Sequence, residues 1–154
     1  MYWEVKRKLE EAGYNHYEIS NFAKEGCESK HNLDCWNQKE YLGFGLAAHS
    51  YMNDQRYSNV SDFNKYINNN QEKVIHEIQD KESKMKEYML LGLRKIEGIS
   101  ISEFENKFAK NPLNLYKEEL SELEKQGRIN VSKNQIKLTN KGIDFANQVW
   151  EYFL

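Results

Sequence analysis

The sequence has few cysteines, almost no net charge and no long apolar run, and each shortage excludes a class of protein. Cys27 and Cys35 are the only cysteines in 154 residues, too few for a disulfide framework and wrongly spaced for a CxxC metal hook. The net charge of −2 gives the whole chain no electrostatic reason to bind nucleic acid. No apolar stretch approaches the ~20 residues that cross a bilayer, and the N-terminus lacks signal-peptide features. We therefore expect a cytoplasmic protein with free, partly buried thiols.

Residues 1–81 show the pattern of an α/β unit. Apolar residues three and four apart predict a helix that ends at Gly13, and the string YEISNF predicts one short strand with no second strand nearby. NDQRY predicts a turn with a strand edge on either side, and DFNKYIN predicts a helix. A polar linker that carries His76 as a solvated histidine would follow, with a domain boundary near 78–82. A helix, a strand and a polar loop are typical of an α/β unit whose sheet lies elsewhere.

Residues 82–154 predict three helices, a hairpin and a last helix. The first helix would run to Gly98, and Ser100 to Glu103 forms a capping box for the second. Pro112 would open the third helix, which Gly127 ends. Alternating apolar residues in 129–138 predict a hairpin, and the last helix would cover 141–153. This is the order of a winged-helix module.

The charge of the predicted third helix argues against DNA binding by such a module. A winged helix usually lays this helix in the major groove, where lysine and arginine contact phosphates. Here YKEELSELEKQGR carries four glutamates against three basic residues, a balance that repels phosphate. We expect a packing role or a protein contact instead.

Two patches contain side chains suited to chemistry. In the first, Glu18, Ser20 and Asn21 would emerge at the carboxyl end of a strand, where sheet enzymes place ligand groups. The alternative is that Ser20 and Asn21 cap a turn and Glu18 is exposed. The second patch runs from His31 to Ser50, a polar, aromatic stretch interrupted by glycines, which is either a site-forming loop or a structural one.

Within the second patch, an imidazole, an amide and an indole fall within six residues, at His31, Asn32 and Trp36. An imidazole can ligate haem iron, and an aromatic wall suits a planar macrocycle. A lone histidine can equally be a hydrogen-bonded structural residue. GFGLAA lacks the strand and helix context of a dinucleotide fingerprint, although small residues let backbone approach a ligand closely.

Taken together, the strings resemble one family over essentially the whole chain. They are GYNHYEISNFAKEG, ESKHNLDCWNQKEYLGFGLAAHSY, RYSNV and EYMLLGLRKIEGIS. The sequence is similar to the C-terminal half of the oxygen-independent coproporphyrinogen III oxidase-like radical S-adenosylmethionine proteins. HNLDCW resembles the H-N-x-x-Y-W string of the haem-chaperone branch, with Cys35 in place of the usual tyrosine.

The resemblance implies an α/β segment followed by a small α+β domain. Residues 1–81 would supply the last strands and helices of an incomplete TIM-like barrel, and residues 82–154 a winged-helix-like C-terminal domain. A longer protein would hold a 4Fe-4S cluster and S-adenosylmethionine through a CxxxCxxC loop. This chain lacks that loop, so we expect it to bind no cluster and to be inactive alone. The implied partners are haem or coproporphyrinogen, the missing N-terminal barrel and a haem-receiving protein.

The resemblance also assigns candidate site residues, position by position. His31 would contact haem or porphyrin as a possible iron ligand, and Asn32 and Trp36 would shape the site. Residues that match two further family strings would line the cofactor cavity: Gly43, Gly45, Ala48, His49 and Ser50 from G-x-G-x-x-A-H-S, and Glu18, Ser20 and Asn21 from E-I-S-N-F. The alternative from another class is a non-catalytic interaction module built on the winged helix. An exposed sheet edge would also favour dimers.

Overall fold

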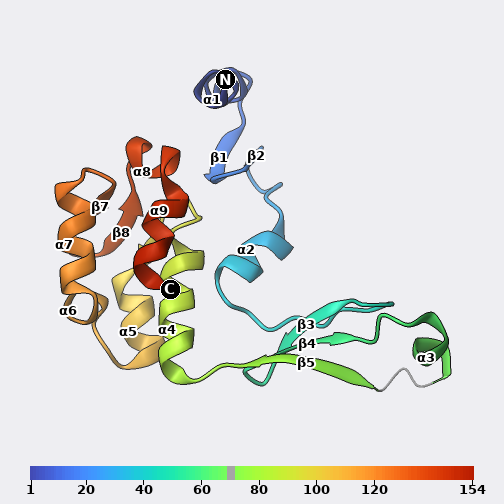
Figure 1. Cartoon of the computed structure of the whole chain (residues 1–154). Coiled ribbons are helices and arrows are strands. Elements are labelled where there is room, and N and C mark those ends of the chain that lie inside the picture. Colours follow the sequence, from blue (N-terminus) through green and yellow to red (C-terminus); the bar gives the residue numbers. More distant parts are fainter. Residues whose placement is uncertain (69–71) are drawn as a thin grey trace. The chain divides into compact units, whose positions relative to one another are not determined.

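A computed structural model describes residues 1–68 and 72–154, which form two compact units (Figure 1). The first unit combines residues 1–37 with 85–154, and the second contains residues 38–84. In residues 1–68 and 72–154 the strands make three separate sheets, and every strand pairing among them is antiparallel. The predicted mixture of helix and sheet is confirmed. The described ranges contain no closed barrel and none of the parallel strand pairs of a TIM-like barrel. The predicted boundary between residues 81 and 82 stays a prediction.

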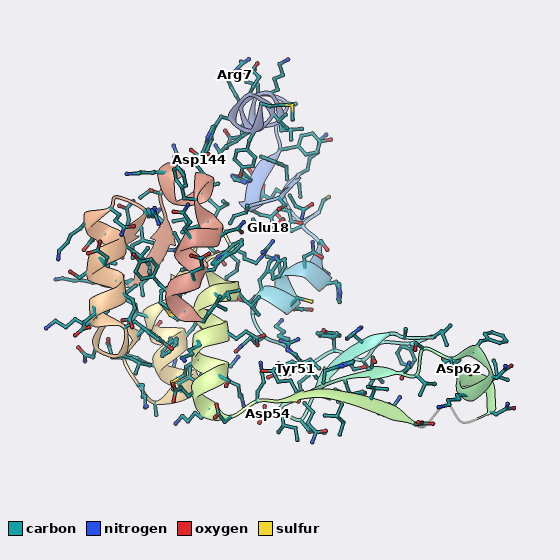
Figure 2. All side chains as sticks on the ribbon, viewed as in Figure 1. Arg7, Glu18, Tyr51, Asp54, Asp62 and Asp144 are labelled. Atoms are coloured by element: carbon teal, nitrogen blue, oxygen red, sulfur yellow. The ribbon has the colours of Figure 1, made fainter. Side chains whose placement is uncertain are left out.

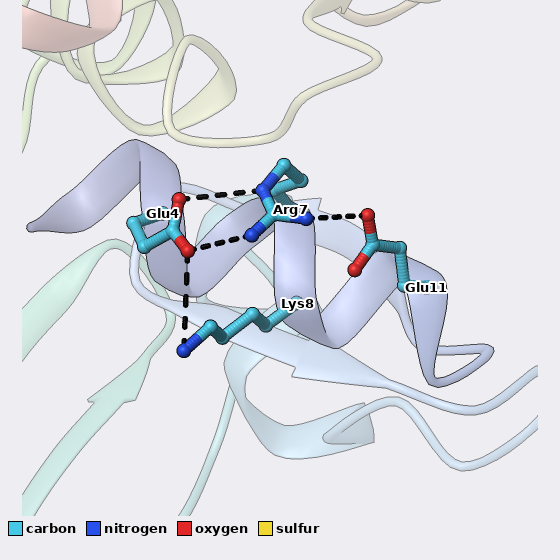
Figure 3. Close-up of polar contacts among 4 residues, drawn as sticks. All are labelled: Glu4, Arg7, Lys8 and Glu11. Atoms are coloured by element: carbon cyan, nitrogen blue, oxygen red, sulfur yellow. Dashed lines mark hydrogen bonds and ion pairs between the residues drawn. The ribbon is translucent and has the colours of Figure 1, made fainter.

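The first unit begins with helix α1 (Tyr2–Glu11), as predicted, and Gly13 follows it with a φ of +82°. On the solvent face of α1, Arg7 pairs with Glu4 and Glu11, each at 2.6 Å, and Glu4 also lies 3.9 Å from Lys8 (Figure 3). Such exposed pairs add little to stability. The other face carries Tyr2, whose hydroxyl donates to the backbone carbonyl of Ile19 at 2.8 Å. That bond ties the helix to the hairpin that follows.

Strands β1 (Asn15–Glu18) and β2 (Asn21–Ala23) form that hairpin, so the prediction of a single strand in YEISNF was wrong. Two residues inside the string turn the chain back on itself. The turn also contacts the C-terminal part of the chain, because the Ile19 N–H donates to the Arg94 carbonyl at 3.0 Å and Glu18 forms a β-bridge with Lys95. These bonds explain why residues 1–37 belong to one unit with residues 85–154. Helix α2 (Lys30–Trp36) follows the hairpin.

The second unit is a three-stranded sheet with one short helix. Strands β3 (His49–Met52), β4 (Gln55–Asn59) and β5 (Lys73–Ile78) pair in that order, and α3 (Phe63–Asn68) lies between β4 and β5 in sequence. The predicted turn and helix are confirmed. The predicted linker was wrong at His76, which lies in β5, because β-branched residues there favour a strand once β4 offers an edge. The amides at 69–71, part of the same predicted linker, fall outside the described residues.

The C-terminal part follows the predicted order of helices and hairpin and adds one strand. Its elements are α4 (Lys81–Gly92), β6 (Ile99–Ser100), α5 (Ile101–Phe108), α6 (Pro112–Leu115), α7 (Lys117–Lys125), β7 (Ile129–Val131), β8 (Gln135–Leu138), α8 (Asn140–Asp144), α9 (Ala146–Trp150) and η1 (Glu151–Phe153). The sheet order is β6-β8-β7. The capping box is confirmed at its first bond, because the Ser100 hydroxyl accepts from the Glu103 N–H at 3.3 Å.

Three predicted helices differ in extent. The first ends at Gly92 rather than Gly98, because the chain turns back there and Ile99 packs onto the glycine, where a Cβ would lie 2.5 Å from its Cγ1. The third is divided at Tyr116 (φ −113°, ψ 35°) and the last at Phe145 (φ −119°, ψ 30°). The break at Tyr116 accompanies edge-on contacts of its buried ring with Phe104 and Phe153. Packing therefore overrides a continuous helical pattern.

The main core lies in the C-terminal part of the first unit. Its fully buried members include Met89, Leu93, Ile99, Phe104, Leu123, Ile129, Ile136 and Val149. Within residues 1–68 and 72–154, no helix combines the length and the apolar character that a membrane span requires.

Candidate functional site

Helix α2 presents His31 to solvent. The Ser29 hydroxyl caps the helix by accepting from the Asn32 N–H at 3.4 Å, which fixes the first turn. The His31 side chain is exposed, and its Nε2 lies 3.8 Å from the Sγ of Cys35, one turn further along. Asn32 and Cys35 are both partly buried. The departure from the family string at position 35 therefore places a thiol beside the candidate imidazole.

Trp36 leaves α2 on another side and packs inward. Residues five apart on a helix point about 140° from each other, so the indole and the His31 imidazole diverge. The Arg94 guanidinium lies 4.3 Å from the centre of the Trp36 ring and 4.9 Å from that of Trp150. The Nε1 atoms of both indoles are buried without a hydrogen-bond acceptor in the described chain. The structure thus joins Trp36 to Arg94 and Trp150, two residues that the sequence analysis missed.

The hairpin turn holds Glu18, Ser20 and Asn21 together. Glu18 (labelled in Figure 2) is 0% exposed, so the interpretation of an exposed carboxylate was wrong. Its Oε1 accepts from the Ser20 N–H at 3.2 Å and from the Asn21 side-chain amide. Its Oε2 is buried and has no donor among the residues that the structure describes. A buried carboxylate oxygen without a donor is energetically costly.

Two adjoining cavities open beside this turn. One has a volume of about 470 Å³ and is lined by Arg94, Trp150 and polar residues near α9. The other, about 630 Å³, has an apolar wall that includes Tyr2, Val5 and Phe22. The two share four lining residues: Ile19, Ser20, Ile143 and Asp144. Of the predicted cavity residues in this unit, only Ser20 lines either cavity.

The apolar cavity adjoins a hydrogen-bonded pair, Tyr2 and His16. The His16 Nε2 lies 3.0 Å from the Tyr2 hydroxyl oxygen and 3.3 Å from the Ile19 carbonyl. Burial lowers the pKa of His16, and the Ile19 carbonyl opposes that shift in part. Burial and the nearby carboxylates of Glu18 and Asp144 raise the pKa of Tyr2. The folded state therefore favours neutral forms of both rings.

The lowered pKa of His16 predicts a loss of stability in mild acid. Below pH 6.5, the ordinary pKa of histidine, His16 takes up a proton in the unfolded chain more readily than in the folded chain. The contribution of neutral His16 to the free energy of unfolding is therefore complete above pH 6.5, and it is lost as the pH falls through the lower pKa of the folded state. We expect the urea midpoint of the wild type to fall more between pH 7.5 and 5.5 than that of His16→Gln. Equal decreases in both proteins would contradict the assignment.

The string from Gly43 to Ser50 lies in the second unit and forms a braced loop. The Gly43 N–H donates to the buried Ser50 hydroxyl at 3.0 Å, and a Cβ at Gly43 would lie 2.2 Å from the His49 carbonyl oxygen. Gly45 has a φ of +109°, which only glycine adopts readily. The Asn59 side-chain amide donates to the Gly45 carbonyl at 2.7 Å. The conformation of the loop therefore requires glycine at positions 43 and 45, whether or not a ligand binds there.

At the edge of this loop, the exposed His49 ring stacks on His76, with centroids 5.0 Å apart. The His76 Nε2 lies 2.9 Å from the Ser58 hydroxyl oxygen. Ala48 is partly buried, and its carbonyl accepts from the Asn59 N–H at 3.0 Å. His31 and these residues fall in different units, so the predicted stretch from His31 to Ser50 contains two separate local structures.

The donor set does not fit a 4Fe-4S cluster. Such a cluster is held mainly by cysteine thiolates, and the whole sequence has two. Cys27 is exposed in the loop after β2, and Cys35 lies in α2. In the described part of the chain, no three histidine, cysteine, aspartate or glutamate side chains come together as a metal-binding group. Haem iron needs only one or two axial ligands, and an imidazole nitrogen such as that of the exposed His31 is one ligand type.

The sequence is similar to proteins of two named kinds, HemN and HemW. Residues 79–145 match the family model for the HemN C-terminal domain. The chain is 38% identical over 156 residues to the heme chaperone HemW of Lactococcus lactis subsp. lactis (strain IL1403), and 40% identical over 159 residues to that of Bacillus subtilis (strain 168). All of the chain aligns, but it spans only 41% and 42% of those relatives.

A solved structure shares the fold. The coproporphyrinogen III oxidase HemN from Escherichia coli, a radical SAM enzyme, superposes with a TM-score of 0.74 at 16% identity. The match covers 98% of this chain and 39% of that one. It shows the fold of this segment alone.

Proposed function

We propose that this chain is a haem-binding C-terminal part of a HemW-like protein, because residues 79–145 match the family model for the HemN C-terminal domain and the whole chain is similar to heme chaperone HemW. The observation that supports this function is the exposed imidazole of His31 at the start of α2. An imidazole nitrogen is a common axial ligand of haem iron, and the Cys35 thiol beside it is the alternative ligand from the same helix.

Haem titration tests the role of His31. We expect His31→Ala to bind haem at least about tenfold more weakly, a loss of about 1.4 kcal/mol, and to lose the Soret shift of imidazole ligation. His76→Ala is the matched control, because it removes another exposed imidazole from the second unit. Cys35→Ser distinguishes nitrogen from sulfur ligation, since its Soret maximum changes only if sulfur binds the iron.

Equal haem affinity and an unchanged Soret maximum in His31→Ala would contradict the proposal. A loss confined to His76→Ala would move the haem ligand to the second unit. Far-ultraviolet circular dichroism of each variant separates lost binding from lost folding.

The longer protein is a further part of the proposal. It would hold a 4Fe-4S cluster, S-adenosylmethionine and either haem or coproporphyrinogen in a barrel that residues 1–81 complete, and this chain alone would lack catalytic activity. A cytoplasmic location and a haem-receiving partner belong to the same proposal. The order α4-β6-α5-α6-α7-β7-β8 supports a winged helix in the C-terminal part, with α6 and α7 in the place of the third helix. These features stay predictions.

A non-catalytic interaction role is the second candidate function. Its support is the apolar surface of the second unit, where Phe44 is 85%, Ile78 69% and Phe63 65% exposed. Large exposed apolar groups mark contact surfaces for another protein, the rest of a longer chain or a second copy. Sedimentation at increasing concentration tests dimerisation, and a purely monomeric chain would remove the second copy as the occupant.

A further inference from the structure

We propose that Arg94 binds a carboxylate of an apolar aromatic ligand in the cavity beside the β1–β2 turn. The inference rests on the proposed function, because haem and related porphyrins combine a flat apolar ring with two propionates. It assigns to Arg94 a binding role that is separate from iron ligation at His31.

The surroundings of Arg94 leave its guanidinium edge without an anion. The rings of Trp36 and Trp150 both lie within cation–π range of the guanidinium carbon. No carboxylate of residues 1–68 or 72–154 forms an ion pair with Arg94, and its Nε is buried without an acceptor. Aromatic stacking uses the faces of a guanidinium, whereas carboxylates bind its N–H edge in a bidentate manner. The two indoles therefore hold the group for an anion without satisfying its donors.

The cavities provide matching chemistry for an apolar acid. Arg94 lines the one of about 470 Å³, and the adjoining one of about 630 Å³ has the apolar wall with Tyr2 and Phe22. Volumes of this size are typical of small-molecule sites, which combine apolar walls with a few polar groups. The two cavities adjoin, because Ser20 lines both of them. An acid whose carboxylate lies at Arg94 can therefore place its ring against the apolar wall of the neighbouring cavity.

The lining includes one carboxylate that opposes an anion. Asp144 (labelled in Figure 2) lines both cavities, and its Oδ1 accepts from the Trp3 indole N–H at 2.8 Å. That bond supplies one donor to the Asp144 carboxylate, but the carboxylate keeps its negative charge. Replacing Asp144 with asparagine should therefore tighten the binding of an acid severalfold, a direction that a merely structural role would not produce.

The test uses iron-free protoporphyrin, which His31 cannot ligate, and its dimethyl ester, which has no charged carboxylate. Fluorescence titration of the 154-residue chain should show at least tenfold tighter binding of the diacid than of the ester. Arg94→Gln should lose this preference, binding the diacid about as weakly as the wild type binds the ester. Arg94→Lys should be intermediate, because it keeps the charge and loses the planar fork.

Arg128→Gln is the matched control. The Arg128 guanidinium also lies over an aromatic ring, 5.5 Å from that of Phe145, but its Nη2 already donates to the Gln148 Oε1 at 2.7 Å. Arg128 does not line either cavity. We expect Arg128→Gln to keep the preference for the diacid.

Equal binding of diacid and ester by the wild type, or no binding of the diacid, would overturn the inference without any variant. An unchanged preference in a folded Arg94→Gln protein would overturn it as well. Failure of the haem proposal is distinct, because it appears as a Soret band that does not depend on His31. Diacid binding through Arg94 could still be present in that case.

Discussion

Replacing Phe104 with alanine should destabilise the first unit by about 3–5 kcal/mol. Phe104 is 0% exposed, and its ring centre lies 4.8 Å from that of Phe108 and 5.6 Å from that of Tyr88. Truncation removes the buried ring and leaves a cavity that neighbouring rings cannot fill. Because native domains are stable by only about 5–15 kcal/mol, this is a large share of the total stability. Urea unfolding followed by circular dichroism measures the change.

Phe145→Ala is the control for this substitution. Phe145 is the same residue type in the same unit, but 44% of it is exposed and it ends α8 rather than filling the core. Its loss should cost about 1 kcal/mol or less, the cation–π contact with Arg128 being the main part. Equal destabilisation by the two substitutions would show that the aromatic core around Phe104 is not the principal source of stability.

The sequence predicts the C-terminal part well because its signals are local. Apolar residues at helical spacing, such as Met85, Tyr88 and Met89, become the buried face of α4. Ser100 caps α5, and Asn111 accepts from the Leu113 N–H at 2.8 Å at the start of α6. Each signal acts within a few residues, so neither a partner nor a register has to be known.

Features that depend on distant partners were not predictable in the same way. Strand β5 needs β4 beside it, and the β1–β2 hairpin needs the loop that carries Arg94. The position of Arg94 in the largely apolar string LLGLRKI was the available signal for a partly buried guanidinium. Its two indole neighbours come from segments far to either side in sequence, so the group could be found only in the folded chain.

The candidate site shows the same limit. The sequence placed His31 and Trp36 in one patch, yet α2 directs them to different sides. The placement of Glu18 and Asn21 beside a ligand stays a prediction, and the sequence did not indicate that the two side chains bond to each other within the turn. Residue types indicate a chemistry that an experiment can test, but the direction of each side chain depends on the helix and turn that carry it.

Gly98→Ala should destabilise the first unit by about 2–5 kcal/mol. This range is the sum of a conformational cost for the backbone and a steric cost for the added Cβ. Gly98 has a φ of +79°, which costs an L-residue about 1–2 kcal/mol. A Cβ there would lie 2.2 Å from the Ile136 carbonyl oxygen, so backbone must move. The displaced strand β6 pairs with β8 through Ile99 and Ile136. The substitution therefore disturbs the sheet beside the Arg94 loop.

Gly127→Ala separates these two costs. Gly127 has a similar φ of +70°, but a Cβ there would meet nothing within 4 Å. Gly127→Ala should therefore lower the free energy of unfolding by the conformational cost alone, about 1–2 kcal/mol. The difference between the two urea-derived free energies then measures the close approach of Gly98 to β8. If both substitutions cost the same, the contact with Ile136 does not constrain position 98, and the loop from Arg94 to Gly98 would be held by its bonds to the hairpin rather than by this sheet.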